Sequence, residues 1–335
     1  MKNLRKNKIG YIYGIAVLLL LLSAVLGVLL GASDLSLSDM LSSLAKGDLE
    51  SPEARILIYV RLPRMLSTLI CGAALAVSGA VIQGVLANRL ASPSIIGVNA
   101  GAGLAVTVCS ALGIMGGWRL SLFAFVGAFL TVMLVSLGAK KWGASRGTVI
   151  LMGVALNALL GAISDTVTTF NPEVSIQSLD FKIGDFSSVT YAKLIPATVI
   201  VLVSILILLT LSNELDVLTL GDENAKGLGL NTGVMRVIFL LLCALLAGAS
   251  VSVCGLLSFV GLLVPHAVRK IATSESKHLL PLCALFGAGF VSICDTIARV
   301  VFAPYELPVG IIMAFLGAPF FIFILIRGKG GHSRA

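Results

Sequence analysis

Residues 192–229 read AKLIPATVIVLVSILILLTLSNELDVLTLGDENAKGLG, an apolar run that changes abruptly into a polar segment, and a second apolar run follows at residues 234–253. A helix that crosses a membrane needs about 20 mostly apolar residues, because lipid cannot satisfy exposed backbone polar groups. The polar segment is too short for a domain and too regularly patterned for a linker. We therefore interpret this stretch as two spanning helices joined by an element on which another protein docks.

The rest of the chain shows the same division into long apolar runs and short charged segments. Of the 335 residues, 58% are apolar and 12% are charged, and the mean hydropathy is +1.05. This composition excludes a water-soluble enzyme and predicts one all-α, polytopic membrane domain over residues 1–335. About ten spans are predicted, at residues 11–31, 65–86, 94–115, 120–138, 148–170, 192–211, 234–253, 257–268, 279–300 and 309–326.

Two features of this span pattern bear on architecture. The eighth span is well short of a full crossing, so we expect a half-length or re-entrant segment there. Spans two to five and spans seven to ten would run in opposite directions, which is typical of the inverted repeats of transporters. This repeat rests on the span count alone.

The basic residues predict the orientation. Residues 1–8 and the following apolar run look like a signal peptide, but the run is too long and lacks a cleavage site, so we expect a retained first span. Most of the 24 Lys and Arg residues lie on one side when both termini are placed in the cytoplasm. The polar loop, residues 213–232, is then cytoplasmic, and residues 32–59 and 171–191 form short outer helices. The net charge of +8 indicates contact with anionic lipid rather than nucleic acid.

Motifs of catalysis and of metal or nucleotide binding are absent from the sequence. There is no GxxxxGK[ST] loop for ATP phosphates, no GxSxG and no HExxH, and the three His residues are scattered. The six Cys residues all lie in apolar runs without a CxxC or a Cys/His cluster, which favours small buried hydrophobes over ligands. The chain is therefore not expected to be an enzyme.

Few ionisable residues lie within the spans. Asp165 falls near the outer end of the fifth span, and Asp295 and Arg299 are four residues apart, so they can pair on one helix face. A proton-coupled carrier would need carboxylates deep in the membrane, and their absence suggests an external energy source. Glycines recur within the spans, and they predict close helix packing or, alternatively, a smooth path wall: Gly72, Gly79, Gly84, Gly97, Gly101 and Gly103.

The polar loop has its own pattern of alternating apolar and charged residues. Gly221 and residues 227–229 allow a sharp break and a helix stop. We predict two short amphipathic helices at right angles that present an apolar knob to a cytoplasmic partner, with a solvated loop as the alternative. The pattern consists of apolar Leu215, Leu218, Leu220, Ala225 and Leu228 among Asp216, Asp222, Glu223 and Lys226.

These residues resemble a known family. Residues 220–231, Leu-Gly-Asp-Glu-Asn-Ala-Lys-Gly-Leu-Gly-Leu-Asn, are similar to the coupling loop of the permeases of iron–siderophore and cobalamin ABC importers. Further blocks follow the family order over nearly the whole chain: Arg61-Leu62-Pro63-Arg64, residues 258–266 with Arg269, Asp295 with Arg299, residues 306–310 and residues 317–320.

Two segments depart from the family pattern. Residues 87–91 read Ala-Asn-Arg-Leu-Ala where the family has Arg-Asn-Pro-Leu-Ala, and residues 181–185 read Phe-Lys-Ile-Gly-Asp where it has Trp-x-x-Gly-Ser. Both are expected near the mouths of the transport path. They leave the particular substrate open.

The resemblance implies a permease subunit of a type II ABC importer in a bacterial cytoplasmic membrane. It implies a homodimer with a path along the two-fold axis, two cytoplasmic ATPase subunits that bind ATP and magnesium, and an extracytoplasmic substrate-binding protein. The permease itself would carry no cofactor. The expected cargo is a ferric siderophore, with cobalamin or haem as alternatives, and whether the second permease is identical or a paralogue stays open. The alternative from another class is a stand-alone secondary carrier.

The resemblance also assigns candidate site residues. The outer arginines are expected to meet carboxylates on the two lobes of the binding protein, which suits the planar guanidinium. The ATPase-coupling residues are Leu220, Gly221, Asp222, Glu223, Ala225, Leu228 and Gly229; the docking residues are Arg61, Arg64 and Arg299; and the path residues are Gln83, Asn99 and Ser250.

Overall fold

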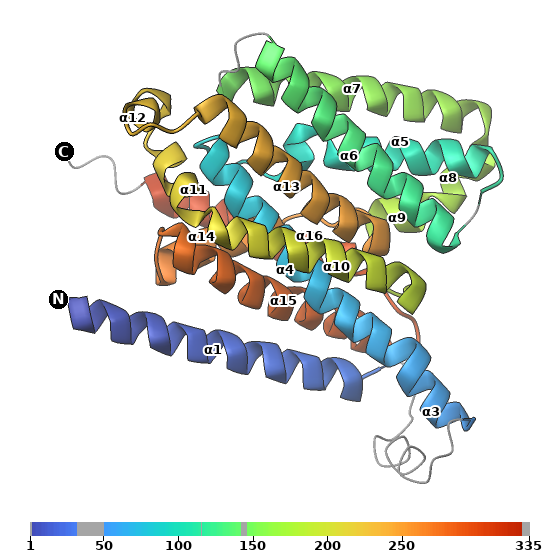
Figure 1. Ribbon diagram of the computed structural model, residues 1–335. Helices are drawn as coiled ribbons and strands as arrows, with labels where there is room; N and C mark the ends of the chain where they lie inside the picture. Colours follow the sequence, from blue (N-terminus) through green and yellow to red (C-terminus); the bar gives the residue numbers. More distant parts are fainter. Residues whose placement is uncertain (1, 32–49, 115, 142–145, 330–335) are drawn as a thin grey trace.

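The computed structural model describes residues 2–31, 50–114, 116–141 and 146–329, and every regular element within these ranges is a helix (Figure 1). The predicted all-α fold is confirmed. The helices are α1 (Lys2–Leu29), α3 (Pro52–Ile56), the π-helical η1 (Leu57–Arg61), α4 (Leu62–Val85), the 3-10 helix η2 (Pro93–Ile96), α5 (Val98–Ala111), α6 (Gly117–Lys141), α7 (Arg146–Phe170), α8 (Pro172–Gln177), α9 (Leu179–Ile183), α10 (Tyr191–Thr210), α11 (Ser212–Thr219), α12 (Asp222–Gly227), α13 (Thr232–Cys254), α14 (Val260–Ile271), α15 (Ser276–Val300) and α16 (Val309–Lys329).

Each predicted span has a helix at its position. Among the described residues, seven helical stretches are long and apolar enough to cross a membrane, and α5 is a shorter apolar helix. The eighth span is short as predicted, because α14 has only 12 residues. The number of full crossings and the inverted repeat stay predictions.

The boundaries of two spans differ from those predicted. The second span begins earlier, because the side chain of Ser51 accepts from the N–H of Ala54, Pro52 opens the helix, and the helix continues through α3 and η1 into α4. The third span is divided, since Gly97 adopts a left-handed conformation with φ of 96° between η2 and α5. Part of the predicted outer segment, residues 32–49, lies outside the described residues.

The core of the molecule consists of α4, α13 and α15. In α4 and α13, 72% of the residues of the apolar window are buried, against 17% in α7. Glycines bring these helices together: a side chain at Gly72 would overlap the backbone of Gly287 on α15, and one at Gly79 would overlap Gly261 on α14. Close packing is therefore what Gly72 and Gly79 provide.

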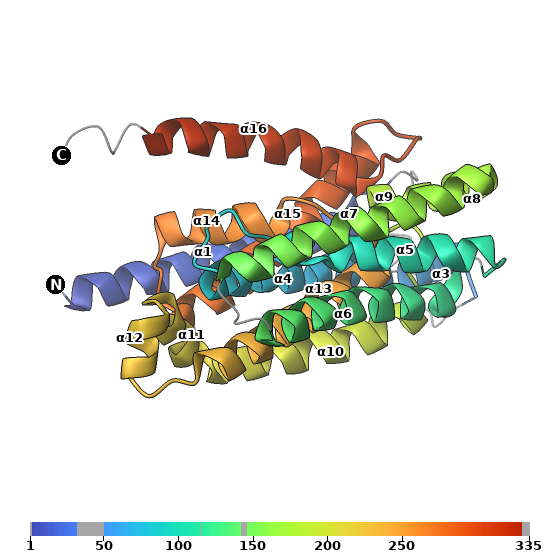
Figure 2. The ribbon, with the colours of Figure 1, turned by 90° about the horizontal axis from the view of Figure 1, so that it is seen from above.

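The two ends of the helix bundle differ. The N-terminus of α1, the end of α16 and α12 lie at one end, which we name the loop end, and α3 and α8 lie at the other, the arginine end (Figure 1). The start of α1 and the end of α16 thus lie at the same end of the bundle as the polar loop, while the side of the membrane stays a prediction. Seen from above, α16 lies at the edge of the bundle (Figure 2).

Candidate functional site: an arginine cluster and a helical loop

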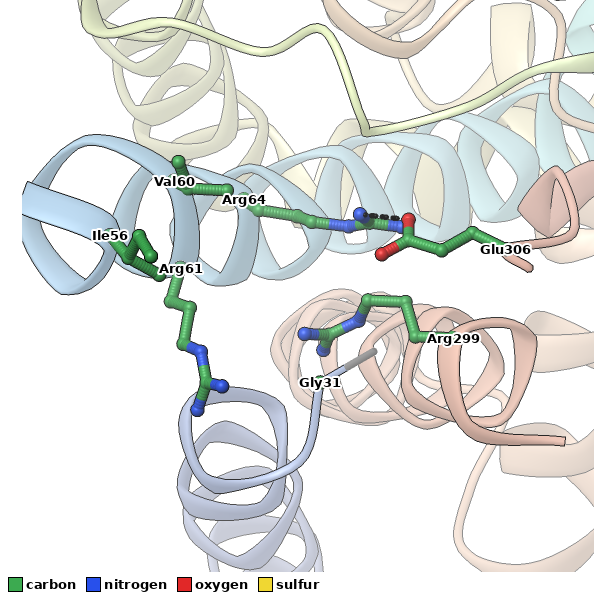
Figure 3. Close-up of a pocket in the computed structure, with 7 residues that line it drawn as sticks. All are labelled: Gly31, Ile56, Val60, Arg61, Arg64, Arg299 and Glu306. Atoms are coloured by element: carbon green, nitrogen blue, oxygen red, sulfur yellow. Dashed lines mark hydrogen bonds and ion pairs between the residues drawn. The ribbon is translucent and has the colours of Figure 1, made fainter. Parts of the chain in front are cut away.

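The three predicted docking arginines come together at the arginine end. Arg61 ends η1, Arg64 lies in the first turn of α4, and Arg299 lies in the last turn of α15. Because the start of α4 packs beside the end of α15, residues more than 200 positions apart line one cavity of about 250 Å³ (Figure 3). Its other lining residues are Gly31, Ile56, Val60 and Glu306.

A buried carboxylate joins two of these arginines. Asp295 is fully buried and accepts hydrogen bonds from Nε and Nη2 of Arg64 at 3.1 and 3.0 Å, and Nε of Arg299 lies 3.1 Å from its other oxygen. The predicted pairing of Asp295 with Arg299 is confirmed. Arg64 also donates from Nη1 to Glu306 at 2.6 Å, and the side chain of Glu306 is 34% exposed. The cluster is thus a buried ion network with one partly exposed acidic member.

Arginines also complete the end of α1. The last carbonyls of a helix lack partners within it. Arg61 donates to the carbonyls of Val28 and Leu29 at 2.8 and 3.0 Å, and Arg299 donates to those of Gly27 and Leu30 at 3.0 and 2.9 Å. The two positive charges also favour the negative end of the helix dipole. The first span is therefore attached to the core by residues predicted to serve docking.

These contacts bear on the predicted docking role. Arg61, Arg64 and Arg299 are only 4%, 5% and 3% exposed, and each is bound to groups of its own chain. The guanidinium groups do line an open cavity, so a carboxylate could reach them from outside. Docking stays a prediction, and any such carboxylate would enter an arginine cluster that already contains two acidic side chains.

At the loop end, the polar segment forms two short helices, α11 and α12, separated by Gly221 with φ of 104°. The predicted pair of helices is confirmed. Leu215 and Leu218 are buried, and Leu215 lies against Gly84 of α4. Leu220 and Leu228 are instead 56% and 66% exposed. The apolar knob therefore consists of these two leucines.

Other members of the predicted coupling set face inward. Ala225 is fully buried, so it supports α12 and cannot touch a partner directly. Asp222 binds Nη2 of Arg236 on α13 at 2.8 Å and lies 3.4 Å from Arg146 on α7. Asp216 accepts hydrogen bonds from the backbone N–H and hydroxyl of Ser276 at 3.0 and 2.6 Å, at the start of α15. The loop is therefore tied to three long helices.

The ion pair of Asp222 predicts a pH dependence. Burial opposes its ionisation, but the hydrogen bond and charge of Arg236, with Arg146 and Lys226, hold the pKa of Asp222 below its ordinary 3.8. Since the unfolded value is the higher one, this contribution is present above pH 3.8 and is lost as the pH falls through the folded pKa. We expect α12 to stay docked at neutral pH and to loosen below pH 3.8.

A fluorophore on Glu223→Cys measures this loosening as a fall in anisotropy. The described native Cys residues are buried, so the label is specific. Asp222→Asn in the same background is the control, and it should give low anisotropy that does not change with pH. A pH-dependent fall of equal size in this control would contradict the assignment to Asp222.

Two of the three predicted path residues lie inside the helix packing. Gln83 donates to the carbonyl of Gly261 at 3.1 Å and accepts from Arg269, and Ser250 donates to the carbonyl of Cys71 at 3.4 Å. Both are buried, whereas Asn99 is half-buried. The polarity of Gln83 and Ser250 thus serves contacts between helices in this structure. Their role in transport stays a prediction.

An exposed face on α7 is not among the predicted sites. A series of small and polar side chains spaced three and four residues apart is exposed along the helix: Ala155, Ala158, Ala162, Asp165 and Thr169. The signal available was the position of Asp165 within an apolar run, because a carboxylate is costly in lipid. The small residues that lie three or four positions apart on the same side of the helix as Asp165 would have completed the pattern of an exposed face.

The segment at residues 181–185, which departs from the family pattern, is wedged between two helix ends. The carbonyl of Phe181 accepts from the N–H of Leu256 at 2.8 Å, and the N–H of Asp185 donates to the carbonyl of Cys254 at 2.9 Å. The N–H of Gly310 at the start of α16 donates to the carbonyl of Gly184 at 3.2 Å. These bonds use the backbone, so the side-chain departures do not prevent them.

A bundle of apolar helices with a protruding pair of short helices at one end and an arginine cavity at the other is the architecture of a polytopic membrane protein. The chain belongs to the FecCD transport family, which matches residues 18–327. This family consists of membrane permease subunits of ABC importers, in which nucleotide binds a separate ATPase and the permease carries no cofactor. The chain is therefore a multi-pass protein of the cytoplasmic membrane.

Three known proteins illustrate the similarity. The Fe(3+)-citrate import system permease protein of Bacillus subtilis is 37% identical over 315 residues, which cover 94% of each chain. The hemin transport system permease protein of Yersinia pestis is 34% identical over 284 residues, 83% of this chain and 85% of that one. A solved structure described as an inward-facing conformation of a putative metal-chelate type ABC transporter superposes with a TM-score of 0.82 at 30% identity, covering 95% of this chain and 99% of that one.

Proposed function

We propose that this chain is the permease subunit of an ATP-driven importer that moves a ferric siderophore across the cytoplasmic membrane. The similarity to the Fe(3+)-citrate permease supports this cargo most directly, because it extends over 94% of both chains and so includes both ends of the bundle. The haem relative supports haem as an alternative cargo, and a vitamin B12 import system permease protein of Yersinia enterocolitica, 35% identical over 305 residues, supports cobalamin equally. Family membership argues against a stand-alone secondary carrier.

We propose that a second copy of the chain completes the transport path. Asp165 is exposed on α7, a helix with only 17% of its apolar window buried. Asp165 lies near the outer end of the predicted span, so this face suits the outer mouth of a water-filled path between two subunits. Phe315 on α16 is 73% exposed, and it would find apolar contacts in such a dimer.

We propose that the binding protein docks at the arginine end through carboxylates. Glu306 is the most accessible member of the arginine cluster, with 34% of its side chain exposed. An incoming carboxylate could therefore take the place of Glu306 on Arg64 while Asp295 stays buried between Arg64 and Arg299. This exchange keeps every guanidinium paired, which avoids the cost of an isolated buried charge.

We propose that the ATPase docks on the knob of Leu220 and Leu228. Movement of α11 and α12 would reach the core directly, since Asp216 holds the start of α15 and Asp222 holds α13. Glu223, which is exposed beside the knob, would meet polar groups at the rim of this contact, and Gly229, with φ of 85°, ends the loop.

Uptake measurements test the cargo. Labelled ferric siderophore, haem and cobalamin are offered to cells with and without the gene, and to cells complemented with the intact gene. We expect loss of ferric siderophore uptake alone. Loss of haem or cobalamin uptake alone would replace the proposed cargo, and unchanged uptake of all three would overturn it.

The knob gives a prediction for energy coupling. Changing Leu220 and Leu228 together to Glu is expected to weaken ATPase binding by about 30-fold, because loss of an apolar anchor costs about 2 kcal/mol. Copurification of the ATPase and uptake should both fall. The control is Leu112→Glu, which changes an equally exposed leucine at the end of α5. Normal ATPase binding by the double variant would exclude the knob as the docking element.

A further inference from the structure

A second cavity lies at the loop end, below the polar loop. It has a volume of about 270 Å³ and is enclosed by the end of α4, by α11, by the end of α14 and by the start of α15. Residues with polar or charged groups dominate its wall: Gln83, Arg89, Thr219, Arg269, Ser274 and Ser276. We name it the basic cavity.

The charge of the basic cavity is unbalanced. Its lining includes Arg89 and Arg269 but no Asp or Glu. Neither arginine forms an ion pair with any residue in the described part of the chain. His266 on α14 lies within electrostatic reach of both and of Lys270, so basic side chains converge here. Arginine side chains in a partly buried site have lost part of their hydrating water. Binding of an anion compensates for this loss, so such a site favours an anion.

A carboxylate that lies beside the cavity is already engaged. Asp216 accepts hydrogen bonds from the N–H and the hydroxyl of Ser276 and so completes the start of α15. The helix end therefore needs no further anion. The excess positive charge belongs to the two arginines.

Arg269 is held in a fixed orientation on the cavity wall. It donates from Nη1 to Gln83 and from Nη2 to the carbonyl of Ala80 at 3.2 Å, and Gln83 in turn donates to the carbonyl of Gly261. These bonds use two of the five N–H groups of a guanidinium, so others can bind an oxyanion. Arg89 is exposed at the rim and can close on the same ligand. The planar guanidinium of Arg269, together with the guanidinium of Arg89, is suited to bind the oxygens of a phosphate group.

We propose that the basic cavity binds a phosphate group, supplied either by a free phosphate anion or by the headgroup of an anionic lipid. Phosphate there would contact Arg269 on α14 and Arg89 after α4, whereas the hydroxyl of Thr219 on α11 already donates to the carbonyl of Asp216. It would thereby join α14 to the segment that follows α4. This cavity is separate from the arginine cluster at the other end of the bundle, and its wall includes Gln83, a predicted path residue.

Protection of the arginines in the intact protein tests the site first. The permease–ATPase complex is placed in nanodiscs of phosphatidylcholine, and arginine modification by phenylglyoxal is followed by mass spectrometry. One arm adds inorganic phosphate at constant ionic strength, and the other replaces part of the lipid with phosphatidylglycerol. We expect modification of Arg89 and Arg269 to slow about tenfold at a phosphate concentration roughly ten times the dissociation constant, because bound anion shields them.

Exposed arginines at the other end provide internal controls. Arg55 and Arg119 are both exposed and should react at the same rate in every arm. Protection by phosphate identifies a free anion as the ligand, and protection only by phosphatidylglycerol identifies a lipid headgroup. Equal slowing at all four arginines, or no protection in either arm, would overturn the proposal.

A variant pair gives a second measurement. In the arm that protects, the ligand should raise the midpoint of thermal unfolding of the intact complex. The rise should disappear in the double variant Arg89→Gln and Arg269→Gln and persist in Arg55→Gln with Arg119→Gln, which removes the same charge elsewhere. An unchanged rise in the first variant would contradict the site even if both proteins fold normally.

Discussion

Replacing Asp295 by Asn is expected to lower the free energy of unfolding by about 3–5 kcal/mol, the usual cost of leaving a buried charge without its partner. Asp295 is fully buried and lies between Arg64 and Arg299, and both guanidinium groups are themselves buried. The asparagine keeps the shape of the side chain but loses the negative charge. Arg64 would keep its ion pair with Glu306, but Arg299 would lose its carboxylate, and two positive charges would lie on either side of a neutral amide.

Equilibrium unfolding in mixed micelles measures this effect. Glu306→Gln is the matched control, because it removes a carboxylate from the same Arg64 but from a site whose side chain is 34% exposed. Its cost should be about 1 kcal/mol or less. Combining Asp295→Asn with Arg299→Met should cost less than the sum of the two single changes, since the second removes a charge that the first leaves unpaired. Additive effects, or a loss below about 1 kcal/mol for Asp295→Asn, would show that the ion network does not hold α4 and α15 together.

Changing Gly79 to Ala is the second large effect. The added methyl group would overlap the backbone carbonyl of Gly261, and a backbone cannot move aside as a flexible side chain can. Overpacking of this kind costs about 1–3 kcal/mol, occasionally more, and we expect the upper part of that range because α4 is the central helix. The same unfolding measurement, with the yield of folded protein, provides the readout.

Gly103 on α5 is the matched control for this substitution. A side chain there would meet no atom within 4 Å, so Gly103→Ala should be neutral or should stabilise the helix by up to about 1 kcal/mol. Equal stability of the Gly79 and Gly103 variants would mean that α4 and α14 separate more easily than their contact indicates. If neither variant gave folded protein, the spans would be generally intolerant of replacing Gly by Ala, and the contact at Gly79 would not be the cause.

Much of the architecture could be predicted because it depends on local composition. The span positions follow from the length of apolar runs, and α7 and α10 begin and end within two residues of the predicted limits. The break at Gly221 and the short helices on either side follow from turn residues and amphipathic spacing. The pairing of Asp295 with Arg299 depends on a separation of four residues within one helix. In each case the physical cause lies within one helical turn or one membrane thickness.

The contents of the candidate sites were harder to predict. Nothing in the sequence near Arg61 indicates that its guanidinium binds the carbonyls at the end of α1. Ala225 and Leu228 have similar apolar character in the sequence, yet one is fully buried and the other is exposed. The resemblance predicts Gln83 as a path residue but gives no indication that its side chain lies against Arg269 in the wall of the basic cavity.

The sequence by itself therefore determined that the chain is an all-helical membrane protein with a structured polar loop and paired charges on α15. Hydropathy, turn chemistry and helical spacing act over short stretches of chain, so their effects can be predicted from the amino-acid sequence. Only the tertiary structure decided which helices form the core, which leucines of the loop are exposed, and which groups the three arginines bind. Those outcomes depend on contacts between residues far apart in sequence, because burial and charge pairing are properties of the packed helices together.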